Sequence, residues 1–382
     1  MGIRSWWIST CDAGPLRPTT APNGGLTLQK LAVLVFAASA LLACAAGCGP
    51  TRRSGPQSSP VIERQEPFVR RPLRLVRGDE WLGEGIAYGP HRDGQRPGGP
   101  SPSPAQIAED LRILARHWRW IRIYGSVELG ETILRTIQAE QLDLHVLLGA
   151  WVAPEESLPD STGAVQHFPD ARAQNRAEIG AAVRLANAYP AIVTAVCVGN
   201  ETQVFWSSHR SAPGVLIGYL RDVRARTHVP VSTADDFNFW NKPESDAVAR
   251  ECDFIVLHAH PLWNSLQLEA ALDWTRVTLE DAEARHPGTP VVLGETGWAT
   301  QRNDQGDQGK LMKGRLGEPE QAAFHQVFRA WVQRARVPSF FFEAFDENWK
   351  GSADPDEVEK HWGLYRADRT PKAAMVDLHR SR

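Results

Sequence analysis

The sequence predicts an α/β fold of the (β/α)₈ TIM-barrel type. Short apolar runs rich in β-branched residues alternate with segments of helical periodicity, and this alternation repeats eight times over about 300 residues. Alternating βα units favour a parallel sheet, and eight of them at this length favour a closed barrel. The structural alternative is a doubly wound sheet, but "GEGIAYG" after the first strand lacks the spacing of a Gly-rich phosphate loop.

The eight predicted strands are short, apolar and bounded by polar or turn residues. They cover residues 82–89, 120–126, 144–152, 191–201, 229–237, 253–263, 289–298 and 339–349.

The predicted helices follow the strands one by one. Ser101 or Ser103 is a plausible cap for the first helix, and Pro319 lies just inside the start of the seventh. The eight helices cover residues 103–118, 128–141, 171–189, 212–227, 244–252, 266–286, 318–336 and 371–382.

Composition indicates a soluble globular protein of 382 residues with a net charge of -3. This charge does not favour nucleic acid as a partner. Five cysteines are too few and too scattered for a disulfide scaffold or a zinc ribbon. Many of the 14 tryptophans must pack in the core, but flat aromatic side chains also suit sugar rings and nucleobases.

The N-terminal region predicts export. About seventeen small and apolar residues after Lys30 are typical of a secretory signal or a marginal membrane span. The stretch "LLAC" resembles a bacterial lipobox, which would make Cys44 the lipidated first residue of the mature protein. We therefore expect an extracytoplasmic, membrane-anchored lipoprotein of the bacterial envelope; an uncleaved anchor and simple secretion are the alternatives.

This gives four parts to the chain. An N-terminal extension without an assigned role (1–25) precedes the signal peptide or anchor (26–48). A flexible linker rich in Pro, Ser and Arg (49–80) then leads to the catalytic barrel (81–382).

Polar and aromatic side chains gather at the carboxyl ends of the predicted strands, where barrel enzymes carry their sites. We expect them to bind substrate. The candidates are Tyr88, Arg122, Tyr124, Trp151, Asn200, Asp235, His258, Trp263, Trp298, Glu343, Trp349 and Lys350.

Two glutamates stand out among these strand ends. Glu201 ends the fourth strand and Glu295 the seventh, so they face each other across a closed barrel. Hydrolysis of a glycosidic bond needs two carboxyl groups flanking it, about 5 to 5.5 Å apart for retention of configuration. A buried charge at Glu295 is tolerable if it is the nucleophile, and strand parity makes Arg122 the candidate for keeping it ionised.

Several stretches in this order resemble glycoside hydrolase family 17: "GIAYGPHRDGQ", "VGNE", "HAHPLW", "GETGW" and "FFFEAFDENWK". The resemblance spans about Leu82 to Lys372. It implies a retaining enzyme acting on β-1,3-glucan, with Glu201 as acid/base, Glu295 as nucleophile and Asn200 on the sugar 2-hydroxyl. It also implies that Tyr88, Tyr124, Trp263, Glu343, Trp349 and Lys350 line sugar subsites.

The sequence departs from the family after the seventh strand. "GETGWAT" stands where the family often has "GExGWPS", and a long polar loop follows at residues 301–317. This loop is a candidate for shaping an acceptor subsite. Hydrolysis, transglycosylation and non-catalytic glycan binding stay open as functions; hydrolysis is favoured, and the presence of both glutamates speaks against the last.

Metal ions are the remaining alternative. His258 and His260 lie two apart on a strand and face the same way, as zinc ligands would. A third histidine is missing from the strand ends, so a lumen histidine that contacts the nucleophile or a sugar is favoured. We expect no metal, no cofactor and a monomer.

Overall fold

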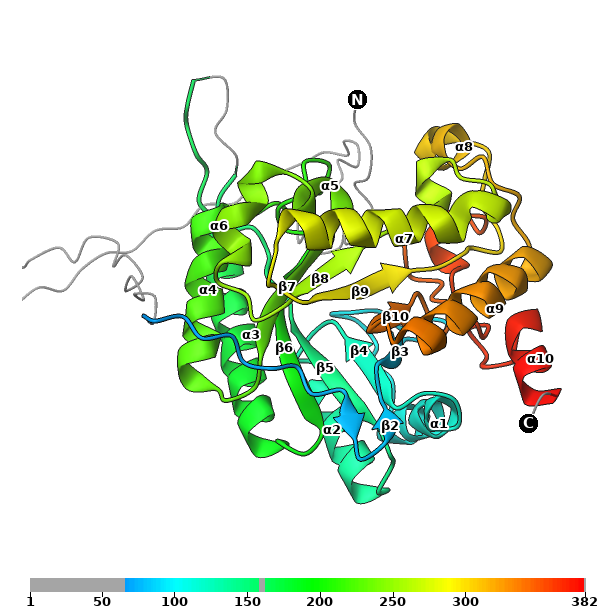
Figure 1. The fold of residues 1–382 in the computed structure, drawn as a ribbon, viewed down its shortest axis with the longest axis horizontal. Coiled ribbons are helices and arrows are strands. Elements are labelled where there is room, and N and C mark those ends of the chain that lie inside the picture. The colour runs from blue at the N-terminus through cyan, green and yellow to red at the C-terminus, as the bar shows by residue number, and fades with distance from the viewer. Residues whose placement is uncertain (1–65, 158–161, 381–382) are drawn as a thin grey trace, which may run out of the picture. The chain divides into compact units, whose positions relative to one another are not determined.

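The computed structural model describes residues 66–157 and 162–380. Eight parallel strands close into a barrel in the order β10-β3-β4-β5-β6-β7-β8-β9 (Figure 1). The predicted barrel is therefore confirmed. The strands are β3 (Glu84–Ala87), β4 (Trp120–Ile123), β5 (His145–Ala150), β6 (Val193–Asn200), β7 (Val231–Asp236), β8 (Ile255–His258), β9 (Val291–Thr296) and β10 (Ser339–Phe341).

Helices follow the strands and surround the barrel (Figure 1). Ser103 caps the first helix in a reciprocal capping box with Gln106, and Pro319 lies in the first turn of α9, as their positions in the sequence predict. The long helices are α1 (Pro104–Ala115), α2 (Gly130–Ala139), α3 (Pro169–Ala188), α4 (Pro213–Arg226), α7 (Leu268–Arg285), α9 (Glu318–Ala335) and α10 (Ala373–Arg380).

The connection between β7 and β8 differs from the prediction of one helix over 244–252. It contains α5 (Phe237–Trp240), a 3-10 turn (Pro243–Ser245) and the single-turn α6 (Asp246–Ala249). The indole of Trp240 is buried and donates to the Val256 carbonyl at 3.0 Å, which holds the chain close to the barrel. The helical part of the predicted segment is therefore shorter than expected, beginning as a 3-10 turn and ending at Ala249.

Two apolar layers build the core. The larger one lies between the strands and the helices and includes Ile121 and Ile123, the outward neighbours of Arg122. The smaller one fills the inside of the barrel at the amino ends of the strands. Its buried members are Leu75, Trp120, Leu147, Ala195, Cys197, Ala234, Phe254, Val256, Val292 and Phe340.

The segment before the barrel packs against its lower end. Its strands β1 (Val76–Arg77) and β2 (Glu80–Trp81) pair as a hairpin, and Leu75 is buried in the inner core. The Arg71 amide donates to Asp253 Oδ1 at 2.6 Å. Packed structure thus begins before the expected linker boundary at residue 80, because a few apolar residues within an Arg- and Pro-rich stretch suffice to cover the barrel floor.

In residues 66–157 and 162–380, no helix has both the length and the apolar character that a membrane span requires. The predicted signal or anchor segment, with Cys44, lies outside the described residues.

Candidate active site

Glu201 is presented at the barrel mouth by an irregular strand end. The β6–β7 pairing shifts register between Cys197 and Asn200, and both Gly199 (φ 76°) and Glu201 (φ 51°) have left-handed backbone. The Glu201 amide donates to the Ala234 carbonyl at 2.8 Å. A non-glycine residue in this conformation costs free energy, and such positions concentrate at functional sites.

Glu295 also comes from an irregular part of its strand, β9. Leu257 of β8 pairs with Leu293 but the next residue, His258, pairs with Glu295, so the register shifts by one residue at Gly294. Glycine at position 294 is required here, because a Cβ would lie 2.2 Å from Val256 Cγ1 and 3.1 Å from the Arg122 guanidinium. The missing side chain lets the guanidinium approach Glu295.

The two glutamates meet over His258. Glu201 Oε1 lies 3.0 Å from His258 Nδ1, and Glu295 Oε1 lies 3.4 Å from His258 Nε2. One oxygen of each carboxylate and one nitrogen of this ring all lie within 4.8 Å of one another. The side chains of Glu201 and Glu295 are 5% and 3% exposed, so both acids are almost wholly shielded from water.

Arg122 connects this cluster to the neighbouring strands. Its Nη1 lies 3.0 Å from Glu295 Oε1 and 2.8 Å from His258 Nε2. Its Nη2 donates to Asn200 Oδ1 at 2.6 Å. The side chain points into the barrel mouth, as strand parity predicts.

Three donors act on the Glu295 carboxylate. Tyr124 donates to Oε1 at 2.8 Å, His260 Nε2 lies 3.2 Å from Oε2, and Arg122 supplies positive charge. Burial opposes ionisation, but the electrostatic effect of His258, the hydrogen bond from His260 and the charge of Arg122 outweigh it and hold the pKa of Glu295 well below its usual value. Glu295 is therefore ionised at neutral pH.

The neighbouring groups stay in their neutral forms. Burial lowers the pKa of His258 to about 3, despite the carboxylate of Glu295 nearby. Burial, followed by the charge of Glu295, raises the pKa of Tyr124 well above its usual value, so its hydroxyl remains a donor. The fixed positive charge of Arg122 is thus the permanent partner of Glu295.

The cluster of Glu201, His258 and Glu295 has the donor atoms of a metal site. However, the Arg122 guanidinium already contacts one possible ligand atom from each of two of these residues, His258 Nε2 and Glu295 Oε1. A metal ion there would face a fixed positive charge at close range. The cluster therefore fits a pair of acids, Glu201 and Glu295, whose neighbouring positive charge is the Arg122 guanidinium and not a metal ion.

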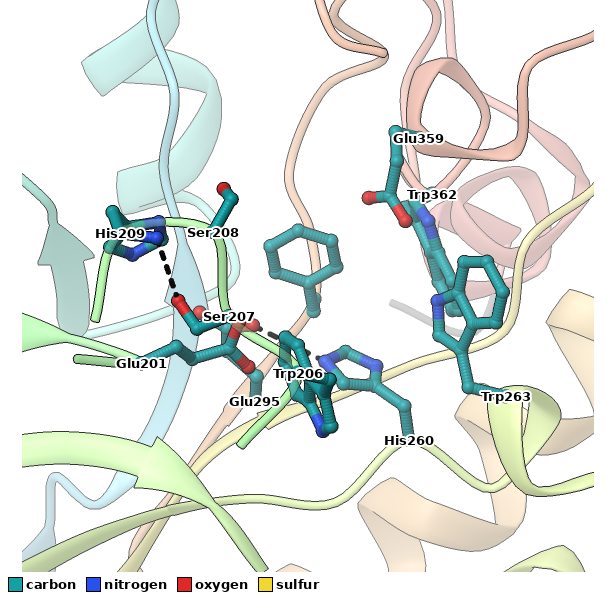
Figure 2. A pocket seen from close by; sticks show the side chains of 11 residues that line it. Glu201, Trp206, Ser207, Ser208, His209, His260, Trp263, Glu295, Glu359 and Trp362 are labelled. Carbon is teal, nitrogen blue, oxygen red and sulfur yellow. Dashed lines mark hydrogen bonds and ion pairs between the residues drawn. The ribbon is translucent and has the colours of Figure 1, made fainter. Parts of the chain in front are cut away.

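A pocket opens above the two glutamates (Figure 2). Ser207, Ser208 and His209 lie on one side, and Trp263, Trp362 and Glu359 lie on the other. The complete lining is Glu201, Trp206, Ser207, Ser208, His209, His260, Trp263, Glu295, Phe342, Glu359 and Trp362.

The long loop at residues 301–317 supports one wall of this pocket. Gln308, in the short helix α8 (Gly306–Leu311), accepts from the Val358 amide at 3.0 Å. Gln267, beyond Trp263, donates to the Lys313 carbonyl at 2.8 Å. The loop therefore braces the segments that carry Trp263, Glu359 and Trp362, without lining the pocket itself.

The sequence profile of the BtgE/BtgC glycoside hydrolase domain matches residues 85–363, which is most of the chain. The chain belongs to the BtgE/BtgC glycoside hydrolase family. The expectation that it is a glycosidase is thereby confirmed, and non-catalytic glycan binding loses its support.

Relatives with curated names agree with this family. The glucan 1,3-beta-glucosidase of Arthroderma benhamiae is 25% identical over 290 residues, covering 73% of this chain and 86% of the relative. The putative glucan endo-1,3-beta-glucosidase btgC of Aspergillus niger is 27% identical over 292 residues, covering 72% of this chain but 40% of the relative.

Solved structures share the barrel. An endo-laminarinase from Formosa Hel1_33_131 superposes with a TM-score of 0.66 and 24% identity, covering 78% of this chain and 88% of the other. A glycoside hydrolase family 17 β-1,3-glucanosyltransferase from Rhizomucor miehei gives 0.59 and 21%, covering 76% and 95%. At these identities the likeness shows the fold alone.

Several predicted site residues of this BtgE/BtgC-type chain lie at the cluster or beside it. Arg122, Tyr124, Asn200 and His258 contact the glutamates or one another, and Trp263 lines the pocket. Half-exposed Trp151 packs against the ring of His209, with ring centroids 5.0 Å apart.

Three other predicted site residues, Glu343, Trp349 and Lys350, lie in the segment after β10. Lys350 Nζ lies 2.6 Å from Glu343 Oε2, and both side chains are buried. Trp349 is half-buried and donates to Glu347 at 3.0 Å. These residues do not line the pocket over the glutamates.

Tyr88, Asp235 and Trp298 have buried side chains with protein partners. Tyr88 donates to Asp110 at 3.1 Å, and the Trp298 indole donates to the Arg315 carbonyl at 3.0 Å. Asp235 accepts from the Gln203 amide at 2.7 Å and so fixes the loop after Glu201. These contacts indicate that the three side chains support the surrounding loops. The position of the residues near strand ends had predicted contact with substrate.

Sequence reasoning missed the pocket residues that lie on loops. Trp206 follows Glu201 by five positions, but Ser207, Ser208, His209, Glu359 and Trp362 belong to no strand end. A tryptophan soon after an acidic strand end was the one available signal for Trp206. Nothing local pointed to Trp362, which reaches the site through the fold of the segment after β10.

Proposed function

We propose that the protein is a retaining β-1,3-glucan hydrolase of glycoside hydrolase family 17 type. The observation that carries this proposal is the meeting of Glu201 and Glu295 at the carboxyl end of the barrel, with an oxygen of each within 4.8 Å. This separation suits double displacement, whereas inversion needs about 6.5 to 9.5 Å between the carboxyl groups. The names of the glucan-active relatives supply the substrate class.

In the first step, the Glu295 carboxylate attacks the anomeric carbon. Glu201 gives its proton to the departing glycosidic oxygen, so the bond to the leaving sugar breaks as the ester to Glu295 forms. In the second step, Glu201 accepts a proton from water. The resulting attack on the anomeric carbon releases the sugar and restores the Glu295 carboxylate.

The proposed orienter of the reacting sugar is Asn200. Its Oδ1 accepts from Arg122 at 2.6 Å, which fixes the direction of the amide. Its Nδ2 is buried and has no protein partner among the described residues. Because a buried donor without a partner is costly, we assign this Nδ2 to the 2-hydroxyl of the sugar.

Transglycosylation is the second candidate. The pocket beside Glu201 and Glu295 presents three indoles, from Trp206, Trp263 and Trp362, and such surfaces hold sugar rings in place of water. A sugar hydroxyl bound there would resolve the glycosyl-enzyme in the second step. Hydrolysis and transfer share every earlier step.

The test is product analysis on laminari-oligosaccharides of defined length. Proton NMR of the first products should show the β-anomer before mutarotation, and initial α-anomer would overturn the retaining mechanism. Mass spectrometry separates the two outcomes of the second step. Shorter products alone mean hydrolysis, and products longer than the substrate mean transfer.

We also propose that the enzyme is a lipoprotein of the bacterial envelope, anchored through Cys44. The apolar run after Lys30 and the "LLAC" stretch support this. Full-length protein should partition into detergent on Triton X-114 separation, and Cys44→Ser should move it to the aqueous phase. Retention of Cys44→Ser in the detergent phase would instead indicate an uncleaved anchor.

A further inference from the structure

His258 lies between the two glutamates, and neither the proposed chemistry nor the sugar contacts use it. Its ring is fully buried, with Nδ1 3.0 Å from Glu201 Oε1 and Nε2 2.8 Å from Arg122 Nη1. A neutral imidazole has one donor nitrogen and one acceptor nitrogen. The partners of the ring therefore determine which nitrogen carries the hydrogen.

Arg122 decides the tautomer. A guanidinium only donates hydrogen bonds and keeps its charge in proteins, so His258 Nε2 must accept from Nη1. The hydrogen of the neutral ring is then on Nδ1, where it donates to Glu201 Oε1. Glu295 Oε1 lies 3.4 Å from Nε2, and both atoms, like the Gly294 carbonyl oxygen, lie within 3.0 Å of Nη1. A hydrogen on Nε2 would face the guanidinium donor at 2.8 Å.

The tautomer in turn determines where Glu201 carries its proton. Oε1 accepts from His258 and is the carbonyl-like oxygen of the protonated acid. The hydroxyl hydrogen then belongs to Oε2. When Glu201 has given up this proton, the same Nδ1–H bond stabilises the carboxylate that must act as base.

We infer that His258 is a positioning residue, locked by Arg122 as the Nδ1–H tautomer, that assigns the catalytic proton to Glu201 Oε2. This inference rests on the proposed roles of Glu201 and Glu295. It also gives a function to the His-Ala-His stretch that resembles a metal motif. His260 acts on the other side of the site, 3.2 Å from Glu295 Oε2.

Other charged groups surround this pair and bear on any pH profile. Asp236 of β7 and His260, just beyond β8, act electrostatically on His258, together with Arg122 of β4 and Glu295 of β9. Asp235 of β7 acts on Glu201. All of these remain in place when only the ring at position 258 is changed.

The direct test observes the unaltered protein. Histidine labelled with ¹⁵N gives long-range proton–nitrogen spectra that distinguish the Nδ1–H tautomer, the Nε2–H tautomer and the imidazolium. The signal is assigned by its loss in His258→Asn. We expect the neutral Nδ1–H pattern between pH 5 and 8, and either other pattern at pH 6 would overturn the inference.

Two matched variants test the consequence for Glu201. Asn places an amide nitrogen near Nδ1 of the native ring, and Gln places its amide near Nε2. The basic limb of the kcat/KM profile reports the general acid. We expect His258→Gln to move this limb upward by about one pH unit, since the carboxylate loses a charge-assisted donor, whereas His258→Asn leaves it within about 0.3 unit.

Equal movement of the limb in both variants, or no movement in His258→Gln, would contradict the positioning role. Thermal unfolding shows whether each variant folds. If His258→Gln does not fold, the tautomer spectrum of the unaltered protein decides whether His258 has the inferred Nδ1–H form. Failure of the proposed function is distinguishable, because it would appear as unchanged glucan turnover in Glu201→Gln. Unchanged turnover in Glu201→Gln would not affect the nitrogen spectrum, which would still report the tautomer of His258.

Discussion

The two ends of the barrel lumen are both buried, but they are built from opposite kinds of side chain. At the lower end, Trp120 packs on Phe340 with ring centroids 4.1 Å apart. Two residues further along β4, Arg122 enters a cluster of carboxylates and histidines. The same step on β8 leads from apolar Val256 to His258. One end therefore supplies stability through apolar burial, and the other holds charges whose free-energy cost is offset only by close partners.

The largest effect should come from removing the proposed nucleophile, Glu295, at the upper end. Glu295→Gln should lower glucan turnover at least about a thousandfold, since no other group can form the glycosyl-enzyme. Release of reducing ends from laminarin measures this. Glu283→Gln, on the exposed face of α7, is the matched control and should keep full activity. Comparable activity in both variants would remove Glu295 from the mechanism.

A substitution at the lower end should produce the reverse pattern. Phe340→Ala should lower the free energy of unfolding by about 3 to 5 kcal/mol through loss of burial and a remaining cavity. Activity below the unfolding transition should be retained. Urea denaturation with parallel assays checks this, and Phe340→Leu should cost less. A loss of kcat without a loss of stability would break the distinction between the two ends.

Arg122→Ala should change the pH dependence of the upper end. Arg122 lowers the pKa of Glu295, so its removal should raise that pKa and leave more of the nucleophile protonated at low pH. The acidic limb of the kcat/KM profile should therefore move upward, by about one to three pH units. Arg122→Lys keeps the charge and should move it less. An unmoved limb in Arg122→Ala would assign the ionisation of Glu295 to its hydrogen bonds alone.

The smallest effect is expected at the pocket rim. Trp206→Ala should weaken binding of an acceptor sugar by up to about tenfold, as expected for loss of one aromatic contact. The readout is the ratio of longer to shorter products at fixed acceptor concentration. Phe205→Ala is the control, because Phe205 is 60% exposed and does not line the pocket. Equal ratios in the two variants would remove Trp206 from the acceptor site.

Much of the barrel and its acid pair was predictable because both follow from local patterns. Apolar runs such as 291–296 mark strands, and in a parallel barrel all strand ends meet at one face. That rule alone brings Glu201 and Glu295 together and turns Arg122 toward them. It also explains the inexact predictions: Trp298 lies beyond a strand end but turns into the layer under α9, where it packs on Phe324.

The loop-borne half of the pocket was not predictable from the sequence for a physical reason. Trp362 and Glu359 line the pocket because Gln308 and its neighbours hold the segment after β10 in place. Contacts between two irregular segments follow no periodicity. A histidine that contacts the proposed nucleophile was expected from the sequence, but the position of His258 between both glutamates was not, because the guanidinium beside it is distant in sequence.

Arg122 reaches from its own strand to three others: to Asn200 on β6, to His258 on β8 and to Gly294 on β9. A single side chain thus links four of the eight barrel strands around the two glutamates. Heating that breaks any of these strand-to-strand contacts would disturb Glu201 and Glu295 at the same time. Thermal inactivation of this enzyme should therefore be abrupt, with turnover rising until the barrel opens and then vanishing within the same few degrees.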